Sequence, residues 1–166
     1  LGGNKLAHFA IKQLTELGYY TLVLDRFISE ELRLICCETL EIDFFDAESA
    51  IVALSNKRID AVIPLNDYAV LSAAKISRKF NLTGYSVGAA EAVKEKAIMK
   101  SLWKKHGVPS ANHVSFLGKN ADCYINDWHK FPCILKPSFA GGGSRDVIYC
   151  ETRSVLQKYL GEFRTK

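Results

Sequence analysis

The sequence lacks a long hydrophobic run. Apolar stretches such as residues 61–65 continue for only a few positions, whereas a helix that crosses a membrane needs roughly 20. No basic segment followed by an apolar one marks a secretory signal at the N-terminus. The composition, 48% hydrophobic and 24% charged in 166 residues, is globular and excludes a disordered tail. We therefore expect a cytoplasmic protein without a membrane partner, of one domain or of one small domain and part of another.

Cysteine is present in an odd number, and no two cysteines form a C-x-x-C pair with histidines at ligand spacing. This pattern excludes a disulfide framework and a zinc site. We expect small buried side chains in a reducing compartment. The four histidines are scattered as well, and we expect no catalytic residue and no metal ligand in this chain. The cysteines are Cys36, Cys37, Cys123, Cys133 and Cys150.

Charge is unevenly distributed along the chain. Residues 1–93 carry 9 basic and 12 acidic side chains, a net charge of −3. Residues 94–166 carry 13 basic and 6 acidic side chains, a net charge of +7. A basic second half favours a polyanionic ligand, which is either the phosphates of a nucleotide or a nucleic acid.

The first half alternates strand and helix patterns, joined by short links. Such alternation predicts a parallel sheet with right-handed crossovers. Gly18 is a natural end for the first helix, Asp46 a cap for the second, and Asp67 a cap for the third. The expected elements are helices at 6–17, 46–54 and 67–80 and strands at 20–24 and 59–63.

The chain opens on a strand-to-helix turn, Leu1-Gly2-Gly3, with no strand before it. It closes after a helix at 154–163 for which the sequence shows no packing partner. We therefore expect that a few apolar residues precede Leu1 and that the chain is truncated at both ends.

The second half has a different character. A helix carries Ile98, Met99, Leu102 and Trp103 as its apolar face and ends at Gly107. A strand at 131–137, a glycine loop and a returning strand at 147–150 predict a hairpin, so this half is α+β. We place the domain boundary near residues 88–94.

Lys136 is the strongest chemical candidate. It stands late in a predicted buried strand, just before Gly141, Gly142, Gly143 and Ser144. From a fixed strand its ammonium can reach phosphates, and glycines without a Cβ let backbone N–H groups approach them. The lysine precedes the glycines, so this is not a Walker loop. A hairpin with a glycine turn and an exposed lysine is the structural alternative. We favour phosphate binding, because adjacent glycines cost entropy without a structural benefit.

A second candidate is the lysine-rich helix that opens with Glu95-Lys96, which on its own is typical of a solvated helix face. The order along the chain is more specific. An acidic–lysine pair opening a helix, then Gly107-Val108-Pro109, then FPCILKP at 131–137 and a glycine loop, resembles the ATP-grasp superfamily. The resemblance is greatest to its carbamoyl-phosphate-synthase-like and amino-acid-ligase branch.

The resemblance implies an α/β fold with two parts. Residues 1–90 would form a Rossmann-like parallel-sheet domain that precedes the ATP-grasp domain. Residues 91–166 would form the α+β N-terminal subdomain of the ATP-grasp fold, incomplete at its end. Segments 60–64 and 82–86 look like the last part of the first domain.

The resemblance also implies residue roles. Lys96 would contact ATP phosphates, Lys136 the α-phosphate and the adenine side, and residues 141–144 the β- and γ-phosphates. Magnesium would be a cofactor, with its ligands beyond the glycine loop and outside this chain. Many relatives have glycine where this chain has Asp146, a residue type that tolerates a left-handed backbone.

The implied activity belongs to the whole protein. It would activate a small carboxylate as an acylphosphate with ATP and join it to an amine or similar nucleophile. We expect the 166-residue chain alone to be inactive. The assembly state is left open, with a homodimer among the options.

Three alternatives remain. A nucleotide-binding or regulatory module without turnover is the first. A nucleic-acid binder would need aromatics interleaved with the lysines, and Trp103 and Phe131 are better assigned to packing, so we expect no nucleic-acid partner. Asp25 after Gly2-Gly3 faintly resembles a dinucleotide fingerprint, but the glycine spacing fails.

Overall fold

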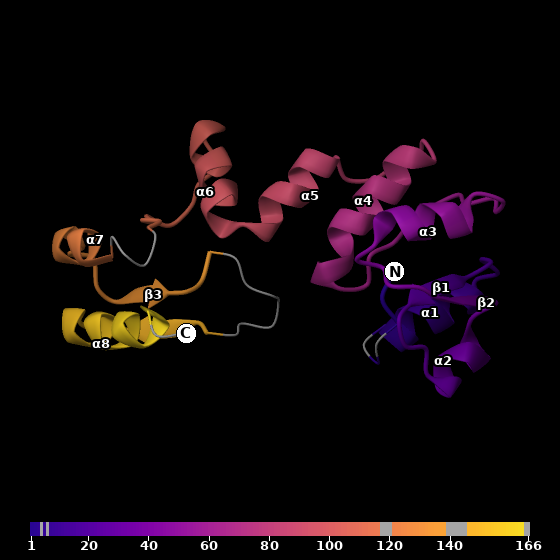
Figure 1. Ribbon diagram of the computed structural model, residues 1–166, viewed down its shortest axis with the longest axis horizontal. Coiled ribbons are helices and arrows are strands. Elements are labelled where there is room, and N and C mark those ends of the chain that lie inside the picture. The colour runs from indigo at the N-terminus through magenta and orange to yellow at the C-terminus, as the bar shows by residue number, and fades with distance from the viewer. Residues whose placement is uncertain (4, 6, 117–120, 139–145, 165–166) are drawn as a thin grey trace. The chain divides into compact units, whose positions relative to one another are not determined.

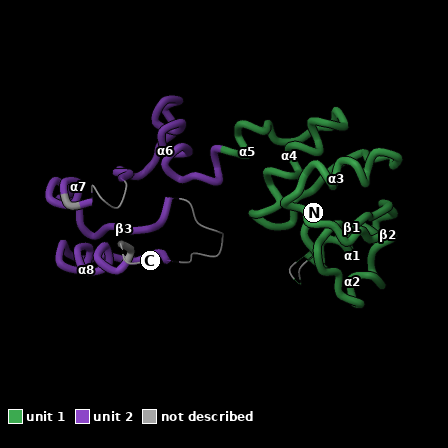
Figure 2. Tube along the Cα trace, in the orientation of Figure 1, with its two compact units in different colours: residues 1–91 green, residues 92–166 purple. Residues whose placement is uncertain are grey.

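The chain folds into two compact units. The structure is a computed structural model that describes residues 1–166 except 4, 6, 117–120, 139–145 and 165–166. The first unit is Leu1–Glu91 and the second is Ala92–Lys166 (Figure 2). Each is described separately below.

The first unit is built from helices around a short parallel pair of strands (Figure 1). The sequence predicted most of its helices but missed two elements, the helix α2 and the strand β2. The elements are α1 (Ala7–Glu16), β1 (Leu22–Asp25), α2 (Glu30–Ile35), β2 (Glu38–Glu41), α3 (Ala47–Leu54), the 3-10 turn η1 (Asp67–Ala69), α4 (Val70–Lys79) and α5 (Val87–Lys94), the last of which continues into the second unit.

Strand β1 is buried on both faces. It pairs with β2 in parallel, Leu22 opposite Glu38 and Asp25 opposite Glu41. Successive side chains of a strand point to opposite faces. Val23 accordingly packs with residues of α1 and α2, and Leu24 packs with residues of α3 and α4. Helices therefore pack on both faces of the parallel pair.

The N-terminal residues lie beside β1 and extend the pairing. The Gly2 N–H donates to Leu24 O at 3.0 Å, and Leu65 N–H donates to Leu1 O at 2.9 Å. The Leu1 ammonium donates to Ile63 O at 2.8 Å. The predicted strand at 59–63 was wrong, because these residues form no strand ladder and only Ile63 bonds to the N-terminus in this way.

The helix caps of the first unit agree with the sequence in two places and differ in one. Asp46 Oδ1 accepts from Ser49 N–H at 3.1 Å and caps α3. Gly18 follows α1 with a φ of 87°, the left-handed conformation of a helix stop. The predicted cap at Asp67 was wrong: Asn66 Oδ1 accepts from Ala69 N–H at 3.0 Å and caps η1 instead.

The second unit has a small core of its own. Cys150 of β4 packs with Ala121 and Ile125 of α7 and with Leu156 and Leu160 of α8. The sequence had shown no partner for the last helix, and this core is the partner. Strands β3 and β4 form the expected antiparallel hairpin. The elements are α6 (Lys96–Lys105), α7 (Ala121–Asp127), β3 (Cys133–Leu135), β4 (Ile148–Cys150) and α8 (Arg153–Arg164).

Two expectations about burial in this unit were wrong. The apolar face of α6 is not buried: Ile98 is 46% and Leu102 is 38% exposed, and the helix has no buried residue. The hairpin strand that precedes Lys136 is only partly buried, since Ile134 is 53% exposed. Strand β3 ends at Leu135, so Lys136 follows the strand directly.

Candidate nucleotide-phosphate site

The first turn of α6 is capped from a distant part of the chain. Glu95 occupies the N-cap position but makes no side-chain cap hydrogen bond. Ser138 supplies the missing acceptors: its carbonyl oxygen accepts from Lys96 N–H at 3.0 Å, and its hydroxyl accepts from Ala97 N–H at 3.1 Å. Two of the unpaired donors of the first turn are thus satisfied.

The Lys96 side chain also lies against Ser138. Its ammonium lies 3.5 Å from Ser138 O, a long contact to a neutral oxygen. Lysine is unfavourable in the first turn of a helix, because the helix dipole is positive there. A bound anion would stabilise a cation at this place.

Lys136 comes two residues before Ser138 in the chain. Its side chain is exposed. Within the described residues its ammonium has no hydrogen-bond or ion-pair partner. The Ser138 contacts therefore bring Lys96 to the segment that carries Lys136, although 40 positions separate the two lysines in the sequence. The predicted contacts Gly141, Gly142, Gly143 and Ser144 lie outside the described residues and stay predictions.

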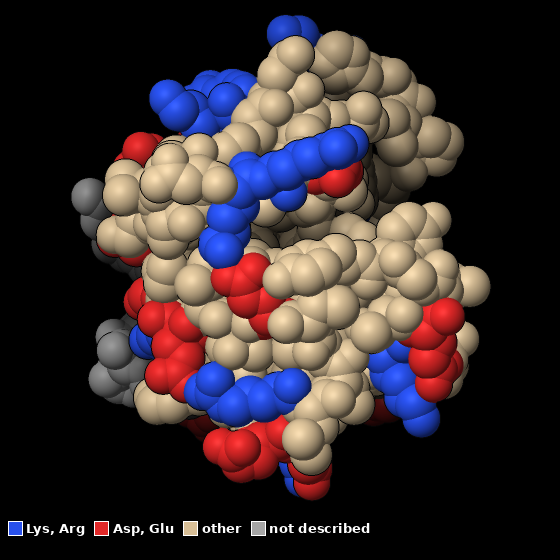
Figure 3. Space-filling model, turned by 90° about the vertical axis from the view of Figure 1, so that its right-hand side faces the viewer, with Lys and Arg blue, Asp and Glu red and all other residues tan. Residues whose placement is uncertain are grey.

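Among the described residues, no ion pair joins a lysine of α6 to a carboxylate. The ion pairs among the described residues all join side chains of the first unit, such as Lys57 with Glu38. In the face seen in Figure 3, acidic side chains lie next to basic ones. The positive charge of α6 is therefore available to a ligand. The lysines of α6 are Lys96, Lys100, Lys104 and Lys105.

Comparison of the sequence with protein-family models and with curated proteins gives no match. Solved structures do match. The N5-carboxyaminoimidazole synthetase from Staphylococcus aureus, complexed with ADP, is 17% identical with a TM-score of 0.78, covering 99% of this chain and 44% of that one. The L-amino acid ligase from Bacillus licheniformis is 19% identical with a TM-score of 0.73, covering 98% and 40%. Phosphoribosylglycinamide synthetase from Anaerococcus prevotii is 20% identical with a TM-score of 0.64, covering 97% and 40%.

These matched proteins are ATP-grasp ligases. The chain has the fold of their N-terminal part. It spans 40–44% of the length of these three structures. The α/β fold expected from the sequence is confirmed. Sequence identities near 20% establish only the fold, so the roles of the site residues stay predictions.

Within this ATP-grasp fold, the described residues contain no group of three or more side chains that could hold a metal ion. The charged side chains of α6 are lysines, whose ammonium groups suit phosphate and do not suit magnesium. In the described part of the chain, no helix is long and apolar enough to span a membrane.

The cysteines differ from expectation. Only Cys150 is buried, and Cys37 and Cys123 are exposed. Burial raises the pKa of the Cys150 thiol, and Cys133 on the paired strand raises it further. A raised pKa keeps the thiol protonated and unreactive. All five are free.

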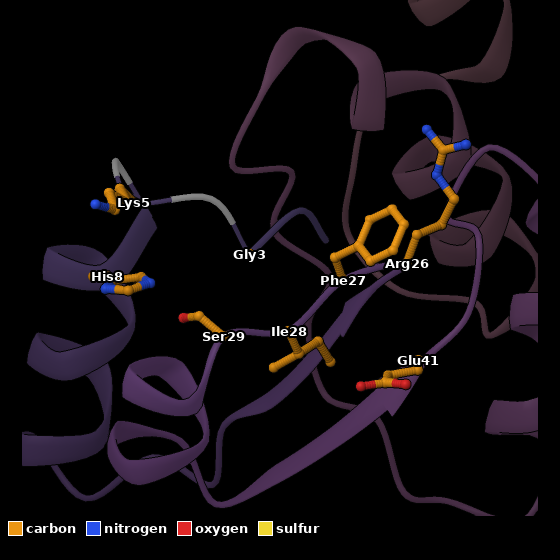
Figure 4. A pocket seen from close by; sticks show the side chains of 8 residues that line it. All are labelled: Gly3, Lys5, His8, Arg26, Phe27, Ile28, Ser29 and Glu41. Carbon is orange, nitrogen blue, oxygen red and sulfur yellow. The ribbon is translucent and has the colours of Figure 1, made fainter.

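A separate cavity of about 470 Å³ lies in the first unit, where β1 ends. In Figure 4, Lys5 and His8 lie on one side of it and Arg26 and Phe27 on the other. None of the predicted nucleotide contacts lines it, and Arg26 in its lining is paired with Asp43 at 3.7 Å. We therefore assign the phosphate site to α6 and not to this cavity.

Ser138 is the site residue that sequence reasoning missed. The sequence around Ser138 shows no local pattern of a helix cap, because the residues that Ser138 contacts, Ala97 and Lys96, lie 41 and 42 positions earlier. The only hint was the absence of a capping side chain at Glu95, which leaves the first turn of a helix without acceptors.

Proposed function

We propose that this chain is the N-terminal part of an ATP-dependent carboxylate–amine ligase, and that Lys96 and Lys136 bind the phosphates of ATP. The ATP-grasp fold supports the general activity. The contact between Ser138 and the first turn of α6 carries the assignment of the site, because it places one lysine beside the segment of the other. The small carboxylate and the nucleophile belong to the whole protein.

The proposed reaction has two steps. A carboxylate oxygen attacks the γ-phosphorus of ATP, forming an acyl–O–P bond while the bond between the γ-phosphorus and the β,γ-bridging oxygen breaks and ADP leaves. An amine then attacks the acyl carbon and forms a C–N bond, the bond between that carbon and the phosphate oxygen breaks so that phosphate leaves, and the amine loses a proton. Neither step requires a nucleophile from the protein. The protein contributes positioning and charge neutralisation.

The two lysines have parallel roles in this account. Each ammonium is a compact point charge that can follow a phosphate oxygen. The dipole of α6, which is positive at the N-terminus of the helix, favours the same negative charge. Magnesium would supply further charge neutralisation for the phosphates of ATP. Its ligands are proposed to lie outside this chain.

The test is the affinity of the full-length protein for Mg-ATP, measured by calorimetry. Lys96→Ala and Lys136→Ala should each weaken binding by roughly 10- to 100-fold, since charge-assisted hydrogen bonds contribute about 1.5–3 kcal/mol. Lys104→Ala is the matched control. It removes the same charge from the same helix, roughly 12 Å further along the axis, and should bind like the unaltered protein. Equal effects of all three substitutions would contradict the site.

Turnover separates the ligase from the alternative. A full-length ligase should release ADP with a suitable carboxylate and amine, whereas a regulatory module should bind Mg-ATP without consuming it. We expect the 166-residue chain alone to be inactive, because the ATP-grasp metal ligands are proposed to lie beyond it. ATP consumption by residues 1–166 that Lys136→Ala abolishes would contradict that expectation.

A further inference from the structure

Helix α6 is held in place by very little apolar packing. It has no buried residue, and in the described part of the chain no other helix or strand packs extensively on it. Its polar contacts are therefore unusually important. Among the described residues, the hydrogen bonds that join α6 side chains or first-turn N–H groups to the rest of the unit go to Ser138 and, through Lys100, to Ala111 O at 3.5 Å.

Ser138 joins the start of α6 to the hairpin through two atoms. Its carbonyl oxygen and its hydroxyl accept from consecutive N–H groups, those of Lys96 and Ala97. Two acceptors on one residue fix both the position and the direction of the first turn. Ser138 follows β3 by three residues, so the strand and the helix share one anchoring point.

We propose that Ser138 is a positioning residue for phosphate binding. By capping α6 from the hairpin, it holds Lys96 in register with Lys136 before the nucleotide arrives. Ser138 itself need not touch the nucleotide, since both of its oxygens are already engaged with α6. This inference rests on the proposed function of the two lysines, and it assigns the residue that organises them.

The expected effect follows from a population shift. Without the hydroxyl, Ala97 N–H loses its acceptor, and the docked position of the α6 first turn is less populated. A ligand that needs a minor state binds more weakly in proportion to that population. A helix cap changes such an equilibrium by about fivefold. Mg-ATP affinity should therefore fall by up to about fivefold in Ser138→Ala.

The hydroxyl is tested by variants of matched shape. Ser138→Thr keeps the acceptor and should bind Mg-ATP like the unaltered full-length protein. Valine has nearly the same shape as threonine but no hydroxyl, so Ser138→Val should bind Mg-ATP like Ser138→Ala. Ser86→Ala is the control for a lost cap. Ser86 Oγ accepts from Ala89 N–H at the same 3.1 Å, but it is a local cap of α5, and its loss should leave Mg-ATP affinity unchanged.

A double-mutant cycle tests whether Ser138 acts through Lys96. If it does, Ser138→Ala should weaken Mg-ATP binding in the unaltered background and have little further effect beside Lys96→Ala. A purely structural role would lower thermal stability and leave the affinity of the folded protein unchanged.

The outcomes separate the two claims. If Lys96→Ala and Lys136→Ala leave Mg-ATP binding intact, the proposed function fails. If both weaken binding while Ser138→Val binds as tightly as Ser138→Thr, the function stands and the positioning role is overturned. Additive effects of Ser138→Ala and Lys96→Ala would overturn it as well.

Discussion

The carboxylate of Asp25, at the end of β1, accepts a hydrogen bond from Gly3 N–H at 2.5 Å. Its other oxygen accepts from Arg26 N–H at 2.6 Å. The acid that resembled the ribose contact of a dinucleotide fingerprint is thus engaged in holding the N-terminal turn against the strand. Its contacts are those of a structural residue.

Replacement of Asp25 should therefore destabilise the first unit. Asp25→Ala leaves the Gly3 N–H without its acceptor, and a partly buried unsatisfied donor costs about 1–3 kcal/mol. Asp25→Asn keeps one acceptor oxygen and should lose less. Urea unfolding monitored by circular dichroism measures the difference. Equal stability of Asp25→Ala and the unaltered protein would show that the turn does not depend on this carboxylate.

Gly2 should tolerate alanine less well than Gly18. Both glycines have a φ of 87°, so alanine is strained by about 1–2 kcal/mol at each. A Cβ on Gly2 would lie 2.2 Å from Asn66 Nδ2, whereas one on Gly18 would meet nothing within 4 Å. Gly2→Ala should thus lower the free energy of unfolding by more than Gly18→Ala. Equal losses would mean that Asn66 moves aside without cost.

The Asp46 cap should make α3 sensitive to acid. Hydrogen bonds from the Ser49 side chain and backbone hold the pKa of Asp46 below its ordinary value of 3.8. A lowered pKa in the folded state means that the stabilisation is complete above pH 3.8 and is lost as the pH falls through the lower folded value. Asp46→Asn keeps an acceptor that does not titrate. Its melting temperature should fall less between pH 5 and pH 3 than that of the unaltered protein, and parallel curves would contradict the cap.

The sequence predicted elements whose pattern is local. Helix α1 has an apolar face and a glycine stop, β1 is a buried apolar run, and α3 begins after a capping aspartate. Strand β2 was missed because three of its four residues, Glu38, Thr39 and Glu41, are polar and give no apolar strand pattern. Helix α2 was missed because it has only six residues. The run at 59–63 has the composition of a strand but lacks a ladder.

The candidate site was predictable only in part. The order of Glu95-Lys96, Lys136 and the glycines pointed to phosphate chemistry, and the fold comparison supports the family resemblance behind it. The cap by Ser138 could not be predicted, since it joins positions 41 residues apart through a single hydroxyl. Pairing of this kind depends on tertiary structure and leaves no periodic pattern.

Asp146 should be replaceable by glycine without loss of backbone stability. It has a φ of 55°, in the left-handed region. Glycine adopts this conformation freely, and alanine pays about 1 kcal/mol or more for it. Asp146→Gly should therefore unfold at a higher temperature than Asp146→Ala, both variants having lost the same carboxylate. The reverse order in a thermal melt would show that backbone strain is not the dominant effect there.

The most direct test of the account is lysine protection by nucleotide. The full-length protein is labelled with an amine-reactive reagent with and without Mg-ATP, and the extent of modification is read for each lysine by mass spectrometry. The account predicts that Mg-ATP protects Lys96 and Lys136 and leaves Lys104 and Lys105, at the far end of α6, equally reactive. Protection that is absent, or equal along the whole helix, would contradict the assignment of Lys96 and Lys136 as the phosphate-binding pair.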